Sequence, residues 1–271
     1  MRTSRRILLI AGLALTTLSG CGGFEQVMKS KDYDLKMKKA NEYYDRKQWS
    51  KSNQLLEEAI KVFKGTKQFE ELYYKYAMTF YNMKDYPSAS LYLKGFVDVF
   101  PNSKNAEECD FLYALCLYKM SPKFELDQTN TYKAVGALQA FMNMHPSSVK
   151  NTEASKLIDN CRKKLEEKEA DAARLYFNIE QFKAASIAYT EVIRKFPESP
   201  IADYYKYMVI RAQYRYAAKS IKDKQEERYA TVSDSYQDFL RSFPNSKYVK
   251  DAEKYFTLTQ NSIKQLRNEQ K

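Results

Sequence analysis

Apolar residues recur along most of the chain at the three- and four-residue spacing of an amphipathic α-helix, and short breaks interrupt them at intervals. Four of these breaks share one phrase, an aromatic residue or His followed by Pro, a polar residue and Ser: Phe100-Pro101-Asn102-Ser103, His145-Pro146-Ser147-Ser148, Phe196-Pro197-Glu198-Ser199 and Phe243-Pro244-Asn245-Ser246. The Pro of each phrase ends one helix, and the Ser hydroxyl is placed to accept a backbone N–H bond at the start of the next. The pattern predicts an all-α fold of repeated helix pairs.

Small residues inside the predicted helices repeat in the register of a tetratricopeptide unit, which places a small residue in each helix and then a Pro 12 residues apart. Two units satisfy this spacing: Ala77, Ala89 and Pro101, then Ala173, Ala185 and Pro197. Ala40 and Ser52 indicate a weaker first unit, which Gly65 closes. Two longer units place 20 residues between their small residues: Ala114 and Ala134, then Ala212 and Val232. We therefore predict a tetratricopeptide-repeat (TPR-like) solenoid of about five helix pairs.

The two longer units each contain an insertion between their helices. The first insertion, from Ser121 to Thr129, is typical of a loop, whereas the charged stretch from Lys222 to Arg228 is typical of a solvated helix extension. Neither Gly nor Pro occurs from Val149 to Asn178, so we expect one helix of about 30 residues, near 45 Å long. A terminal helix from Tyr248 to about Leu266 would cover the last apolar face.

The N-terminus has the pattern of a lipoprotein signal. Three Arg residues precede an apolar run from Ile7 to Leu18, which is too short for a membrane span because a span needs about 20 apolar residues. The run leads into Leu18-Ser19-Gly20-Cys21, a lipobox. Cys21 would carry a diacylglycerol on its thiol and an acyl chain on its freed amine, and three chains hold a protein firmly on a membrane. The alternative is an ordinary signal peptide that happens to contain a cysteine.

These features divide the chain into five segments. They are a lipoprotein signal peptide (1–20), a lipidated N-terminal tether (21–30), an N-terminal half of three repeats (31–148), a long connecting helix that begins the fourth repeat (149–178), and a C-terminal half with its capping helix (179–271). Apart from the lipid on Cys21, the sequence indicates no cofactor.

Charge and residue chemistry exclude several functions. Lys and Arg number 45 against 34 Asp and Glu, for a formal net charge of +11, but the excess is spread along the chain and no base-reading module accompanies it. We therefore expect no nucleic-acid partner and favour a solvated basic face near anionic lipid head groups. The single histidine, His145, directly precedes Pro146, and no catalytic set or metal cluster with workable spacing is found. The sequence does not predict an enzyme.

Three cysteines follow Cys21, and their spacing limits which of them can form a disulfide. Cys109 and Cys116 lie seven residues apart on one predicted helix, roughly 10 Å, which exceeds the ~7 Å limit for a disulfide. Cys161 could pair with either one in an oxidising compartment, but all three occupy positions where a small buried residue would serve. We favour buried free thiols.

Aromatic residues recur four positions after the small residue of each first helix: Tyr44, Tyr81, Tyr118, Phe177 and Tyr216. In this architecture that position faces the concave groove, where tyrosines suit the binding of peptides. The substrate-groove candidates in the N-terminal half are Tyr44, Tyr81, Tyr118, Asn41, Asn82, Tyr74 and Phe111. The alternative interpretation is that these tyrosines only pack the repeats against one another.

The lipobox, the five units with an insertion in the third, the Phe-Pro-Asn-Ser phrases and the turn from Asn82 to Ala89 together resemble the BamD family of outer-membrane lipoproteins. The resemblance runs from Cys21 to about Leu266. It implies an anchor on the periplasmic face of the outer membrane of a Gram-negative cell and a part in the assembly of β-barrel proteins. In that family, N-terminal repeats recognise unfolded barrel proteins, and C-terminal repeats bind the POTRA domains of a BamA-like barrel beside other Bam lipoproteins.

Two other functions compete with this one. Another TPR adaptor lipoprotein could serve cell-wall synthesis, division or polysaccharide export. A nutrient-capturing lipoprotein would show a deep pocket lined by Trp and carboxylates, but this chain has one Trp, Trp49, at a packing position.

Overall fold

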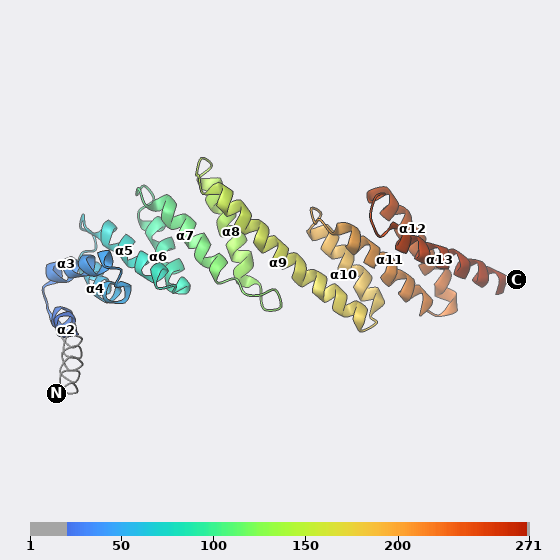
Figure 1. Cartoon of the computed structure of the whole chain (residues 1–271), viewed down its shortest axis with the longest axis horizontal. Coiled ribbons are helices and arrows are strands. Elements are labelled where there is room, and N and C mark those ends of the chain that lie inside the picture. Colours follow the sequence, from blue (N-terminus) through green and yellow to red (C-terminus); the bar gives the residue numbers. More distant parts are fainter. Residues whose placement is uncertain (1–20, 270–271) are drawn as a thin grey trace, which may run out of the picture. The chain divides into compact units, whose positions relative to one another are not determined.

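The computed structural model describes residues 21–269, and the predicted signal peptide lies outside this range. All regular elements within the range are α-helices, which confirms the all-α class (Figure 1). The helices, in chain order, are α2 (Cys21–Lys29), α3 (Tyr33–Asp45), α4 (Trp49–Val62), α5 (Phe69–Asn82), α6 (Tyr86–Val99), α7 (Ala106–Lys119), α8 (Thr129–Met144), α9 (Asn151–Asn178), α10 (Phe182–Lys195), α11 (Ala202–Ala218), α12 (Lys222–Ser242) and α13 (Val249–Glu269).

The helices from α3 to α12 form five consecutive pairs, the fourth through the shared core of α9 and α10, and α13 packs on α12 and α11. The small residues of the predicted register all have no exposed surface: Ala40, Ser52, Ala77, Ala89, Ala114, Ala134, Ala173, Ala185, Ala212 and Val232. In the first pair the Ser52 hydroxyl donates to the Ala40 carbonyl at 2.9 Å, so a polar side chain is satisfied at this close crossing. The tetratricopeptide register is therefore confirmed in all five pairs.

The helices group into two compact units. Among the described residues, one unit contains residues 21–122 and 127–161, and the other contains residues 123–126 and 162–269. Each has its own core, centred on Phe96 and Phe141 in the first and on Tyr189 and Phe239 in the second. The boundary falls within α9, which starts two residues later than expected because Ser148 to Asn151 form a turn.

The four Pro phrases close their repeats in one way. Each residue before Pro has an extended backbone that a helix cannot continue, for example Phe100 at φ −127° and ψ 60°. Each Ser hydroxyl accepts the N–H two residues later, at 3.1–3.2 Å, as expected: Ser103, Ser148, Ser199 and Ser246. Each hydroxyl also donates, at 2.6–2.7 Å, to an acidic residue on the first helix of the repeat that the phrase closes: Glu70, Glu107, Glu166 and Asp203. The phrase therefore also ties the end of each repeat to the first helix of that repeat.

The N-terminal segment is more ordered than the expected tether. Residues Cys21–Lys29 form helix α2, and Phe24, Val27 and Met28 pack on the core of the first repeat. The Phe24 ring lies edge-on to Tyr43, with 5.6 Å between ring centroids. The residue expected to carry the lipid is thus three positions from a packed side chain.

The three internal cysteines are buried and form no disulfide with one another. Cys109, Cys116 and Cys161 each have no exposed surface, in agreement with the preferred interpretation. Burial raises the pKa of the Cys109 and Cys116 thiols to about 12, so both are neutral and unreactive near pH 7.

The insertion of the third repeat is a loop, as predicted, and α9 holds it in place. The Lys168 ammonium donates to the carbonyl oxygens of Phe124, Glu125 and Leu126 at 3.2, 3.3 and 2.9 Å. The charged insertion of the fifth repeat continues helix α12, also as predicted.

Replacing Lys168 by Met should speed amide exchange in residues 121–128 by about tenfold, because hydrogen bonds to a charged donor contribute about 1.5–3 kcal/mol. Hydrogen exchange read by mass spectrometry measures this change. Lys163→Met, an exposed Lys on the same helix, is the control and should leave the loop as protected as before. If the amides of residues 121–128 exchange equally slowly in both variants, contacts other than those of Lys168 hold the loop.

Candidate functional site

Polar contacts connect the first helices of the first three repeats, α3, α5 and α7. On α5, the Lys75 ammonium donates to the Asn41 side-chain oxygen of α3 at 2.8 Å and lies 5.6 Å from the centre of the Tyr44 ring. The Tyr74 hydroxyl, also on α5, donates to the Glu108 carboxylate of α7 at 2.9 Å. These contacts bring five side chains, three of them predicted groove residues, onto one surface of the first unit.

The four tyrosines predicted for the groove are half-buried: Tyr44, Tyr74, Tyr81 and Tyr118. Tyr44 lies edge-on to Trp49, with centroids 5.1 Å apart, and Tyr81 lies near Tyr86 at 6.3 Å. Tyr118 packs beside the cores of its own and the neighbouring repeat. Each ring therefore stabilises a helix corner, and only part of it is open to a partner.

The other predicted residues differ in accessibility. Asn82 is exposed and donates its amide to the Met78 carbonyl of its own helix at 2.7 Å. Asn41 is half-buried and accepts from Lys75, as described above. Phe111 is only 2% exposed and packs edge-on against Phe141, so it belongs to the core and adds no surface to a groove. The prediction that Phe111 lines the groove is wrong, because Phe141 of α8 covers the side of α7 on which Phe111 lies.

The tyrosines of this surface stay neutral at physiological pH. Burial, and next the charge of Glu108, raise the pKa of Tyr44, while burial and the hydrogen bond to Glu108 raise that of Tyr74. Burial likewise raises the pKa of Tyr81. Neutral phenols donate and accept hydrogen bonds and offer a ring face, which suits recognition of a polypeptide.

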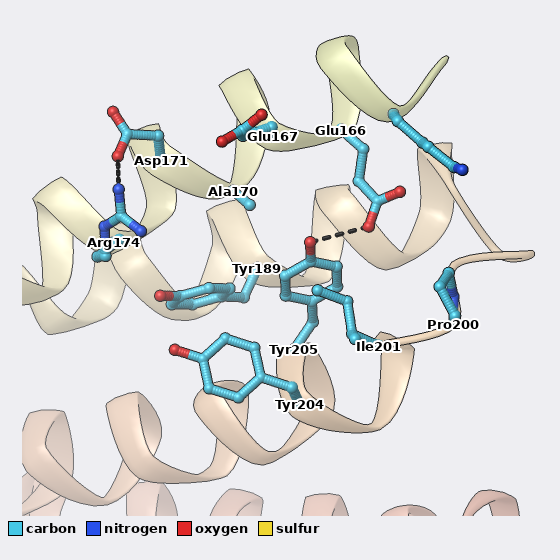
Figure 2. A pocket seen from close by; sticks show the side chains of 11 residues that line it. Glu166, Glu167, Ala170, Asp171, Arg174, Tyr189, Pro200, Ile201, Tyr204 and Tyr205 are labelled. Carbon is cyan, nitrogen blue, oxygen red and sulfur yellow. Dashed lines mark hydrogen bonds and ion pairs between the residues drawn. The ribbon is translucent and has the colours of Figure 1, made fainter. Parts of the chain in front are cut away.

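A second feature lies in the C-terminal unit, where a cavity of about 390 Å³ opens between α9, α10 and α11 (Figure 2). The rings of Tyr189, Tyr204 and Tyr205 line it on one side, and the α9 residues from Glu166 to Arg174 face them. No sequence pattern pointed to this cavity, since none of its residues occupies a small or aromatic position of the register.

The carboxylates at the cavity have different partners. Glu166 accepts from the Tyr205 hydroxyl at 2.9 Å and from the Ser199 hydroxyl at 2.6 Å, so it is fixed by the Pro phrase of its own repeat. Asp171 forms an ion pair with Arg174 one turn along α9. Glu167 forms no ion pair within residues 21–269.

From residue 21 to residue 269, no three His, Cys, Asp or Glu side chains gather closely enough to hold a metal ion. His145 contacts Asp110, with 3.3 Å from Nε2 to the carboxylate. Over the same range, none of the helices combines the length and apolar character needed to cross a bilayer.

Comparison with solved structures finds proteins with similar helical arrangements. The TPR2AB domain of yeast Sti1 in its pHSP90 complex matches with a TM-score of 0.40 and 16% identity, over 84% of this chain and 98% of that one. The Rap conjugation gene regulator of plasmid pLS20 with the Phr* peptide matches with a TM-score of 0.34 and 14% identity, over 87% and 61%. These likenesses are too distant to assign a function.

Sequence comparison is more specific. No curated protein matches this chain. A family model described as "YfiO: Outer membrane lipoprotein" matches residues 31–203, more than half of the chain, from the first repeat into the start of the fifth. With its paired helices in the tetratricopeptide register, the chain belongs to the YfiO family of outer membrane lipoproteins.

Proposed function

We propose that this chain is a lipid-anchored scaffold of outer-membrane β-barrel assembly, held on the periplasmic face of the membrane by acyl chains on Cys21. Its N-terminal repeats bind the C-terminal segments of unfolded barrel proteins, and its C-terminal repeats bind the POTRA domains of a BamA-like protein beside other Bam lipoproteins. Membership of an outer membrane lipoprotein family supports the anchor and the scaffold role. The remaining parts of the proposal extend the family resemblance.

The observation that carries substrate binding is the surface across α3, α5 and α7. It combines half-buried tyrosine rings with polar groups from Asn41, Lys75 and Glu108, all held by contacts between repeats. Such a surface can take apolar side chains of an extended segment and hydrogen-bond its backbone without rearranging. Because these side chains are already held in place, binding does not require the loss of their conformational entropy.

The double variant Tyr44→Leu with Tyr81→Leu should weaken binding of a barrel-derived C-terminal peptide about tenfold or more, since truncation at binding hot spots costs over 1 kcal/mol. Leu retains much of the packing on Trp49 and Tyr86, which Ala would lose. Fluorescence anisotropy of a labelled peptide gives the Kd.

Tyr132→Leu is the matched control, because Tyr132 is 58% exposed on α8, a second helix. It should leave the Kd unchanged. If both variants bind the peptide equally weakly, or if neither binds it more weakly than the wild type, this surface does not bind the substrate.

Crosslinked co-purification tests the wider role in β-barrel assembly. Partners from cell-wall synthesis, division or polysaccharide export, without a β-barrel protein, would favour another TPR adaptor.

A further inference from the structure

The five repeats can be compared at one position of their first helices, three residues before the small residue. The residues there are Met37, Tyr74, Phe111, Ala170 and Val209. Four of them have extended or branched side chains, and only the fourth repeat has a single methyl group. The cavity of the C-terminal unit lies at this residue.

In the first unit, the large residues at this position fill the space before the next first helix. The Tyr74 side chain crosses from α5 to reach Glu108 on α7. Phe111 is buried, with the Lys150 ammonium 4.8 Å from its ring centre. Ala170 supplies no such side chain toward α11, so the space of a large residue remains open as a cavity (Figure 2).

The walls of this cavity favour an aromatic occupant. Tyr189 and Tyr205 are 1% and 3% exposed and so are fixed by packing, whereas Ile201 at the cavity is 46% exposed. Aromatic rings prefer edge-to-face or offset contact with other rings, and cavities of about 300 Å³ and more accommodate a side chain with adjoining main chain. Tyr74 demonstrates the fit of an aromatic side chain at the corresponding place in this same chain.

The charged residues on α9 indicate which kind of partner residue lies next to the bound aromatic ring. Glu166 and Asp171 already have partners within the repeat, while Glu167 at the same cavity has no ion pair within the described residues. Lys163 and Arg174 also line the cavity, so its three carboxylates exceed its cations by one and leave a net negative lining. A basic residue beside the ring would complement Glu167.

We propose that this cavity binds an aromatic side chain of a partner polypeptide, with a neighbouring Lys or Arg of that partner paired to Glu167. The inference rests on the proposed role as a protein-binding scaffold. It does not depend on which protein is bound, because the ring and the cation define the recognised chemistry.

Binding is measured with the full mature chain, ¹⁵N-labelled, by NMR titration with three peptides. The first is acetyl-Gly-Ser-Phe-Lys-Ser-Gly-amide, the second replaces its Phe by Ala, and the third replaces its Lys by Glu. The Phe-Lys peptide should shift amides of α9 and α11 and bind about tenfold more tightly than the other two. Equal binding of the Phe and Ala peptides would overturn the proposal.

The cavity can also be filled from within. Ala170→Tyr copies the residue of the second repeat and should weaken the Phe-Lys peptide about tenfold or more while the far-UV CD spectrum is retained. Ala172→Tyr, on an exposed side of the same helix, should bind like the wild type. Ile201→Ser serves as a second variant that leaves the cavity unfilled and should also weaken binding.

Glu167→Gln should remove the preference for the Lys peptide over the Glu peptide while the preference for Phe over Ala persists. An Ala170→Tyr protein that binds as tightly as the wild type would reject the site. Peptide selectivity without co-purification of barrel machinery would reject the proposed function and leave this inference standing. Co-purification of barrel machinery without peptide selectivity would reject only the inference.

Discussion

Replacing Leu93 by Ala should lower the free energy of unfolding of the N-terminal unit by about 2–5 kcal/mol. Leu93 has no exposed surface and lies in the cluster that also contains Phe96 and Phe141. Truncation removes buried apolar surface and leaves a cavity that the surrounding aromatic rings fill poorly. Urea unfolding followed by far-UV CD measures the loss as a lower midpoint.

Leu91→Ala provides the matched control within the same helix. Leu91 lies two residues earlier on α6 and is 68% exposed, so its removal should change the unfolding free energy by no more than about 0.5 kcal/mol. Because repeats contact mainly their neighbours, amide exchange in the Leu93→Ala protein should rise first in α5–α8. Equal losses in the two variants would contradict the assignment of the core.

The helix pairs could be predicted because their constraints are local. A small residue at each crossing and a Pro 12 residues after the second one leave few arrangements open, and all ten crossing residues are fully buried. The insertions were predictable for the same reason, since they interrupt a known register. Lys222 to Arg228 continues a helix because it contains neither Gly nor Pro.

Contacts between residues far apart in the sequence could not be predicted from these local patterns. Ser103 of the first Pro phrase donates to Glu70, 33 residues earlier, and nothing near Glu70 marks it as a partner. The cavity at Ala170 was also missed, because an Ala in a helix is ordinary until the same position of four other repeats is compared.

For the predicted groove, the sequence indicated which helices carry the tyrosines but not what their rings contact. Periodicity places Tyr44 and Tyr81 on first helices, but it cannot separate a ring that faces a partner from one that packs on the next helix. The structure shows each ring against the aromatic residue that opens the second helix of its repeat, Trp49 or Tyr86. Phe111 is buried for a related reason, since it contacts a ring of the following helix.

Lys36 lies under the N-terminal helix and connects it to the first repeat. Its side chain is 4% exposed, and its ammonium donates to the Met28 carbonyl at 2.8 Å and pairs with the Glu58 carboxylate of α4. Met28 belongs to the last turn of α2, where helix carbonyls lack partners within the helix. Lys36 therefore caps α2 and ties it to the body of the unit, and α2 begins at the residue proposed to carry the lipid.

Lys36→Met should release α2, with a loss of about 1.5–3 kcal/mol for hydrogen bonds to a charged group. A nine-residue helix is not stable alone in water, so amides of residues 24–29 should exchange at close to unprotected rates, as read by mass spectrometry. Lys38→Met, an exposed change two residues away on α3, should leave this protection intact. If α2 stays protected in the Lys36→Met protein, Phe24, Val27 and Met28 alone hold the helix, and the buried lysine has no part in fixing the anchor to the first repeat.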